Sequence, residues 1–165
     1  LILVAIYPFM KRVTWWPQAW LGLTFNWGAL LGFAAQTGRV DAADILLYAG
    51  CFFWTLGYDT IYAHQDVDDD ALIGVKSTAR LFGKDSPRWI LLFYAAAFAL
   101  IATAGLSEHL GPLFLLFMIA PALHLFWQVR SLKVEDAQDC LELFRSNRDA
   151  GGLIALALFV ATFLQ

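Results

Sequence analysis

The stretch GYDTIYAHQDVDDDALIGVKSTARLFG, residues 57–83, follows directly on the apolar run LLYAGCFFWTL of residues 46–56. Four aspartates lie within residues 66–70, and Asp59 lies about one turn inside the apolar segment. An ionised carboxylate inside a membrane span costs about 2.5–3.5 kcal/mol and usually marks function. The carboxylates therefore either mark the end of a membrane helix or bind a cation, and Asp59 favours the second interpretation.

The composition is typical of a membrane protein. Hydrophobic residues make up 60% of the 165-residue chain and charged residues only 15%, whereas soluble domains average about 25% charged residues. No basic stripe supports nucleic-acid binding. Cys51 and Cys140 fall in a predicted span and a predicted loop, so we expect no disulfide. The lipid bilayer is the expected environment, and no obligate protein partner is evident.

Apolar windows of about 20 residues, the length that crosses a bilayer, divide the chain into spans and polar loops. We predict spans at residues 17–36, 42–63, 89–106 and 112–129, a partial span at 1–9 and a short one at 151–164. The predicted fold is an all-α, multi-helix transmembrane bundle that forms one partial domain over residues 1–165. The segment CLELFRSNRD, residues 140–149, is expected to connect two spans along the membrane surface.

The basic residues predict the orientation of this bundle. All but one of the 11 Lys and Arg residues fall in the first, third and fifth polar segments, and only Arg39 falls in the second. Alternation of this kind is what orientation by cytoplasmic Lys and Arg produces. The acidic stretch is therefore expected on the cytoplasmic side.

The spacing of three aspartates predicts a metal site. Asp59, Asp66 and Asp70 are seven and four residues apart, which on one continuous helix places them on the same side with Tyr62 between them. Three like charges on one face need cations, and hard oxygen ligands suit Mg²⁺. Asp68 and Asp69 point elsewhere, and solvent is an equally good explanation for them.

The residues that follow the aspartates supply the complementary charge. Lys76 and Arg80, in IGVKSTAR, can contact phosphate oxygens by charge and hydrogen bond. Carboxylates, metal and basic residues beside a membrane predict binding of a diphosphate carried on a lipid. The alternative from another class is an ion-coupled transporter with Asp59 as the relay, which would leave the basic cluster without a role.

Three segments carry a resemblance to a known family. YDTIYAHQDVDDDALIGVKSTA, residues 58–79, resembles the second aspartate-rich motif of the UbiA family of intramembrane prenyltransferases, and YPFMKRVTWWPQAWLG, residues 7–22, resembles its Tyr-x-x-x-Lys element. FRSNRDAGG, residues 144–152, resembles the last cytoplasmic loop of the family. The resemblance implies nine transmembrane helices, of which this chain would hold the end of the fourth through the ninth. The family's first aspartate-rich motif, Asn-Asp-x-x-Asp-x-x-x-Asp, is absent from the sequence, so we expect this polypeptide alone to be inactive.

The resemblance implies a reaction and its site residues. It implies transfer of a polyprenyl group from polyprenyl diphosphate to the ring of 4-hydroxybenzoate, in ubiquinone biosynthesis, with Mg²⁺ as cofactor. Naphthoate, homogentisate or porphyrin rings are alternative acceptors within the family. The carboxylates of Asp66 and Asp70, with Asp59 as a third participant, would hold the metal.

The same resemblance implies the roles of the substrate-binding residues. Lys76 and Arg80 would contact the diphosphate, and Lys11 could also do so. Arg12 would pair with the benzoate carboxylate because guanidinium binds carboxylate bidentately. Tyr62 would stabilise the allyl cation through its ring face if it faces the cavity, although packing is the stronger expectation for it. The expected location is the bacterial inner membrane, with the mitochondrial inner membrane as the alternative.

Three polar residues outside the motif are given structural roles. Asn26 and His124 lie within predicted spans and are expected to form hydrogen bonds between helices. His64 lies beside the acidic motif but off the predicted carboxylate face, so it is expected to face solvent.

Overall fold

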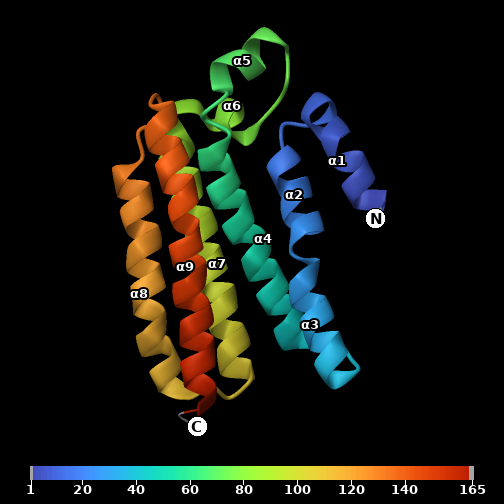
Figure 1. The fold of residues 1–165 in the computed structure, drawn as a ribbon, viewed down its shortest axis with the longest axis vertical. Coiled ribbons are helices and arrows are strands. Elements are labelled where there is room, and N and C mark those ends of the chain that lie inside the picture. The colour runs from blue at the N-terminus through green and yellow to red at the C-terminus, as the bar shows by residue number, and fades with distance from the viewer. Residues whose placement is uncertain (1, 164–165) are drawn as a thin grey trace.

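The computed structural model describes residues 2–163, and every regular element in that part of the chain is helical (Figure 1). The elements are α1 (Ile2–Val13), α2 (Pro17–Phe25), α3 (Trp27–Thr37), α4 (Ala42–Tyr62), α5 (Val67–Leu72), α6 (Thr78–Phe82), the 3-10 turn η1 (Gly83–Asp85), α7 (Ser86–Ser107), α8 (Gly111–Ser131) and α9 (Ala137–Phe163). The predicted all-α bundle is confirmed.

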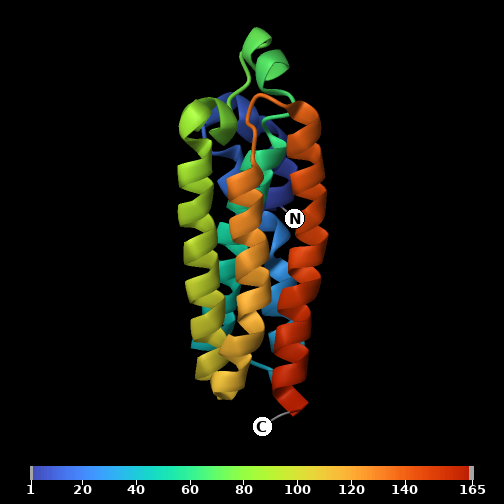
Figure 2. The same ribbon diagram turned by 90° about the vertical axis from the view of Figure 1, so that its left-hand side faces the viewer.

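Four long helices, α4, α7, α8 and α9, run side by side, and α2 and α3 continue the bundle beyond α4 (Figures 1 and 2). The short helices α5 and α6 cover one end of the bundle. The connections after α1, α4 and α8 lie at that end, which we call the basic end, and the connections after α3 and α7 lie at the other. The alternation of basic segments along the sequence thus becomes a difference between the two ends.

The predicted spans correspond to helices. Among the described residues, Thr78–Ser107 and Gly111–Ser131 are both long and apolar enough to cross a bilayer. The window at residues 17–36 contains two helices, because the chain breaks at Asn26 between α2 and α3. The Asn26 amide donates to Gly22 O at 2.8 Å and to Thr55 Oγ1 of α4 at 2.9 Å, which confirms its expected role between helices.

The prediction for the last cytoplasmic segment is wrong. Residues expected to form a separate surface segment are the first turns of α9, which continues through them to Phe163. The buried residues of α9 follow one stripe along its length: Cys140, Leu143, Asn147, Ala150, Ile154, Ala157 and Ala161. Spacings of three and four residues keep this stripe on one face of a helix, so the charged residues between its members do not interrupt it.

A polar network joins α4, α7, α8 and α9 inside the bundle. Trp54 Nε1 donates to Asn147 Oδ1 at 2.9 Å, and Tyr94 OH donates to Gln128 Oε1 at 2.8 Å. Gln128 Nε2 in turn donates to Ser146 Oγ at 2.8 Å. Buried polar groups satisfied in this way fix the relative depth of the helices.

His124 forms a further link between α8 and α9. Its Nε2 atom lies 3.1 Å from the carbonyl oxygen of Ser146, which confirms the expected hydrogen bond between helices.

Candidate active site

The acidic stretch does not form one continuous helix, which corrects the geometric premise of the metal-site prediction. Helix α4 ends at Tyr62, residues 63–66 form turns, and α5 begins at Val67. The turn is held because His64 is buried, with its Nε2 atom 2.8 Å from Ser86 Oγ of α7. The expectation that His64 faces solvent is therefore also wrong.

The three aspartates differ in burial. Asp59 and Asp70 are only 9% and 7% exposed, whereas Asp66 is exposed at the start of α5. Within residues 2–163, the carboxylate oxygens of these three aspartates accept no hydrogen bond, and the hydrogen bonds that these residues form use their backbone atoms. Asp59 and Asp70 thus present nearly buried carboxylates that can accept a cation.

Lys11 is the cation that the fold brings to both buried carboxylates. Its ammonium group acts electrostatically on Asp59 and on Asp70. The end of α1 is held there by the loop after α5, since Lys76 N donates to Lys11 O at 2.8 Å and Lys76 Nζ donates to Val13 O at 3.2 Å. The structure therefore gathers Lys11, Lys76 and the two carboxylates at the basic end.

The surroundings of Asp70 raise the pKa of its carboxyl above the ordinary value. Burial is the largest cause; Lys11 opposes it, Asp66 adds to it, and Arg80 and Asp69 have smaller effects of opposite sign. A carboxylate whose charge is disfavoured by burial and by neighbouring acids gains most from a bound cation. The electrostatics of this position therefore favour cation binding.

The sequence suggested that Arg80 contacts the diphosphate and that Arg12 pairs with the benzoate carboxylate, and the structure places both side chains differently. The Arg80 guanidinium donates to the carbonyl oxygens of Asp70 and Val75, and it lies 5.4 Å from the centre of the Trp15 ring. Arg80 thus holds the loop together. Arg12 is exposed, and its side chain takes part in no hydrogen bond or ion pair within the described range. One residue on a helix turns the side chain by about 100°, so Arg12 points away from the direction of Lys11.

A buried polar cluster anchors the loop beneath the carboxylates. Gln18 of α2 is 2% exposed, and its Oε1 atom accepts a hydrogen bond from Thr78 N at 3.1 Å. Thr78 Oγ1 lies 2.7 Å from Thr60 Oγ1 of α4. These contacts join α2, α4 and α6 at Thr60, the residue after Asp59, so they hold the loop on the end of the bundle.

Replacing Gln18 with leucine is expected to loosen this loop. The substitution leaves the buried Thr78 N–H without an acceptor, which costs about 1–3 kcal/mol. Trypsin should then cleave after Lys76 and Arg80 faster in Gln18→Leu than in the unchanged protein. The matched control is Gln138→Leu at an exposed position of α9, which should leave the cleavage rate unchanged. Equal cleavage rates in all three proteins would contradict the anchoring role.

The three aspartates can hold a metal ion only together with further ligands. In the described part of the chain, no three His, Cys, Asp or Glu side chains lie close enough together to hold one. Asp59, Asp66 and Asp70 therefore do not form a complete three-carboxylate site by themselves. Mg²⁺ commonly uses one or two carboxylates together with water and substrate phosphates, and the open oxygens of Asp66 and Asp70 suit that arrangement.

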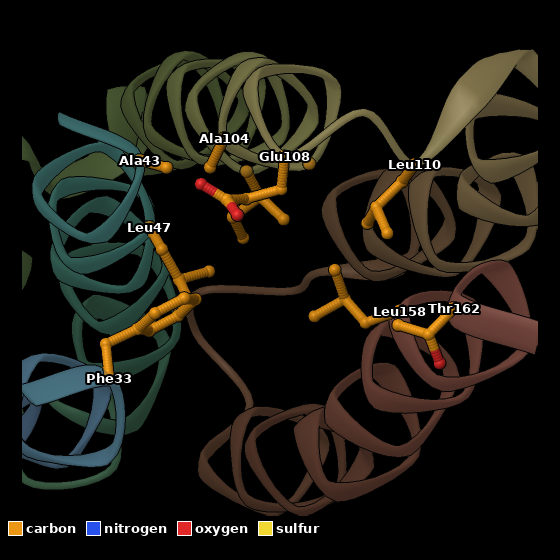
Figure 3. Close-up of a pocket in the computed structure, with 10 residues that line it drawn as sticks. Phe33, Ala43, Leu47, Ala104, Glu108, Leu110, Leu158 and Thr162 are labelled. Carbon is orange, nitrogen blue, oxygen red and sulfur yellow. The ribbon is translucent and has the colours of Figure 1, made fainter. Parts of the chain in front are cut away.

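A cavity of about 380 Å³ lies at the end of the bundle opposite the basic end (Figure 3). It lies between α3, α4, α7 and α9 and is lined mainly by apolar side chains, with the Glu108 carboxylate pointing into it. Because it lacks basic residues among those that line it, this cavity does not have the charge needed for a diphosphate.

Two residues of the bundle interior carry no signal in the acidic motif. Trp54 and Asn147 line a cavity between the α2–α3 junction, α4 and α9, and Trp54 Nε1 donates a hydrogen bond to Asn147 Oδ1. Gly151 leaves room for Trp54, since a Cβ atom there would lie 2.9 Å from the Trp54 ring. The sequence does contain one indication that Asn147 is buried, namely its position at helical spacing among the apolar residues of α9.

Comparison with known proteins identifies what this arrangement resembles. Residues 1–163 match the UbiA prenyltransferase family. The chain is 46% and 48% identical to the mitochondrial 4-hydroxybenzoate polyprenyltransferases of Bos taurus and Rattus norvegicus over 100% of its length, and covers 45% and 44% of them. The apo structure of a UbiA homolog from Aeropyrum pernix K1 has the same fold, with a TM-score of 0.74 and 24% identity over 97% of this chain and 60% of that chain.

Proposed function

The chain belongs to the UbiA prenyltransferase family, and we propose that the whole protein transfers a polyprenyl group to the ring of 4-hydroxybenzoate, a step of ubiquinone biosynthesis. The chain is a multi-pass membrane protein that spans less than half the length of the curated relatives it matches. The activity is therefore proposed for the whole protein. A different acceptor ring within the same family is the second candidate.

One observation carries the proposal. Two nearly buried carboxylates, Asp59 and Asp70, lie around Lys11 at the basic end of a helical membrane bundle. Opposite charges at one mouth of a membrane protein suit a substrate whose diphosphate binds through a metal and whose tail is apolar. Transport alone would not require basic residues beside the carboxylates.

Each residue has a proposed task in the reaction. Asp66 and Asp70 would hold Mg²⁺, with Asp59 beside them, and Lys11 and Lys76 would contact the diphosphate. Magnesium, when bound, neutralises charge on the diphosphate. The two lysines stabilise the negative charge that develops there as the bond to C1 breaks.

The bond changes balance without an outside reagent. The allylic C1–O bond breaks and its electron pair leaves with the diphosphate. The ring carbon ortho to the hydroxyl then attacks C1, forming a C–C bond, and the ring proton is lost. Tyr62, 40% exposed and 4.6 Å from Phe144 between ring centres, presents an aromatic face beside the site that can stabilise the allyl cation.

Ligand protection tests the proposal. With Mg²⁺ and a polyprenyl diphosphate at about ten times its dissociation constant, tryptic cleavage within residues 57–83 of the whole protein should slow about tenfold. Either component alone should protect much less. Protection by Na⁺ alone would instead support an ion-coupled transporter, and the absence of protection by the pair would contradict diphosphate binding.

Location is the coarsest part of the proposal. The relatives compared above are named mitochondrial proteins. We place the protein in a bacterial inner membrane or in the mitochondrial inner membrane, with the acidic loop on the side that the basic residues mark.

A further inference from the structure

A cavity of about 430 Å³ lies between the α2–α3 junction, α4 and α9, and its lining includes Tyr58, the residue before Asp59. Its lining includes aromatic side chains from α4 and α9, the amides of Asn26 and Asn147, and two arginines, Arg145 and Arg148. Aromatic walls with a few placed polar groups are typical of sites for small organic ligands. The two arginines make this cavity basic as well.

The arginines lie deeper in the bundle than loop residues would. Arg145 and Arg148 are three residues apart on α9 and so share a face. They follow the start of α9 by eight and eleven residues, which is about 12 and 16 Å along the helix axis. Charged side chains at such a depth face protein or a water-filled space rather than lipid. Both side chains are exposed in the described part of the chain, and we infer from their depth that this face of α9 lines the interior of the whole protein.

The two arginines differ in what they contact. Arg148 Nε pairs with Asp149 Oδ1 at 3.0 Å. Arg145 has no carboxylate oxygen within 4.0 Å among residues 2–163. Arg145 is therefore the cation of this cavity that is free to pair with an anionic ligand.

Aromatic rings extend from the cavity to Tyr62 at the end of α4. The ring centres of Trp54 and Tyr58 are 5.9 Å apart, those of Tyr58 and Phe144 are 5.8 Å apart, and Phe144 also contacts Tyr62. Because Trp54 bonds to Asn147, Arg145 lies at a depth between Trp54 and Asp59. Trp54 and Asp59 are separated by about 7.5 Å of helix rise.

We propose that this cavity binds the aromatic acceptor as its carboxylate, with Arg145 as the residue that pairs with the carboxylate. The inference rests on the proposed function and adds the residue that determines acceptor specificity. Guanidinium and carboxylate pair through two parallel hydrogen bonds. The aromatic side chains supply faces against which the acceptor ring packs.

Two other positions suit the acceptor less well. Arg12, the carboxylate ligand expected from the sequence, is exposed on α1 and does not line this cavity. The apolar cavity at the other end contains the Glu108 carboxylate, which would repel an anionic acceptor (Figure 3). Charge therefore distinguishes the two cavities.

The test compares a charged acceptor with a neutral one in the whole protein. Prenyl transfer to 4-hydroxybenzoate and to its methyl ester is measured for the unchanged protein, Arg145→Gln, Arg145→Lys and the control Arg130→Gln. Arg130 is exposed at the basic end of α8 and does not line the cavity. In Arg145→Gln the KM for 4-hydroxybenzoate should rise about 10- to 100-fold, while the KM for polyprenyl diphosphate stays within twofold. The preference for acid over ester should fall by the same factor.

A charge-conserving variant and a control variant test whether the charge at residue 145 is responsible. Arg145→Lys keeps the charge and should recover part of the acid preference, and Arg130→Gln should behave as the unchanged protein. The inference is overturned if the KM for 4-hydroxybenzoate is unchanged in Arg145→Gln. It is also overturned if that KM rises in Arg12→Gln but not in Arg145→Gln. Both outcomes leave the proposed function intact. If the unchanged protein prenylates neither acceptor, the proposed function fails, and this inference with it.

Discussion

Replacing Asp70 or Asp66 with asparagine in the whole protein is expected to lower kcat for prenyl transfer by at least about 100-fold. Asparagine keeps the size of the side chain and removes its charge. Asp70 is 7% exposed and interacts electrostatically with Lys11 and Arg80, so loss of its charge weakens that interaction and removes a proposed metal ligand. Asp66 is exposed and its loss should affect metal binding with little effect on folding.

The dependence on Mg²⁺ separates a metal ligand from a structural residue. Both variants should need at least about tenfold more Mg²⁺ for half-maximal activity, whereas a residue that acts only on folding would lower activity at every Mg²⁺ concentration alike. Asp68→Asn is the matched control, because Asp68 is exposed like Asp66 and lies in the same short helix as Asp70 but has no proposed metal role. It should retain activity and its normal Mg²⁺ requirement. Asp70→Asn with near-normal activity at saturating Mg²⁺ would contradict the metal role.

The sequence predicts the helices better than it predicts their ends. Apolar windows locate α4, α7 and α8 because a bilayer requires about 20 apolar residues in each span. The extent of α9 was missed, since Arg145, Arg148 and Asp149 resemble loop residues when charge alone is considered. The buried stripe through Leu143 and Asn147 carries the helix through them, and only its spacing reveals this.

The candidate site shows a similar division. Asp59 and Asp70 could be selected from local sequence because a carboxylate beside an apolar span is unusual. Their relative positions could not be predicted from local sequence, because the helix break at residues 63–66 depends on the contact of His64 with Ser86, 22 positions away in the sequence. The approach of Lys11 to both carboxylates likewise depends on long-range packing between α1 and the loop after α5.

Close packing of α4 on α7 depends on small residues at the contact. A Cβ atom at Gly50 would lie 2.6 Å from Ile101 Cγ1 and 3.2 Å from both Ala97 O and Ile101 N of α7. Ile101 is 2% exposed, so its side chain has no free space into which it could move. The two backbone atoms can move only if the helices separate. Small residues allow this close approach in membrane bundles, where packing is a main source of helix association.

Gly50→Val is therefore expected to lower the free energy of unfolding of the whole protein by about 3 kcal/mol. In detergent this should lower the Tm by roughly 6–12 °C. Gly32→Val is the matched control, since it places the same side chain in a helix where the described residues leave the Cβ position open. The difference between the variants then measures the clash separately from the helix propensity of valine. If both substitutions lower the Tm equally, the α4–α7 contact is not as close as described. If only Gly50→Val does so, the separation of α4 from α7 should also displace Asp59 and lower the affinity for Mg²⁺ and polyprenyl diphosphate at temperatures where the protein is still folded.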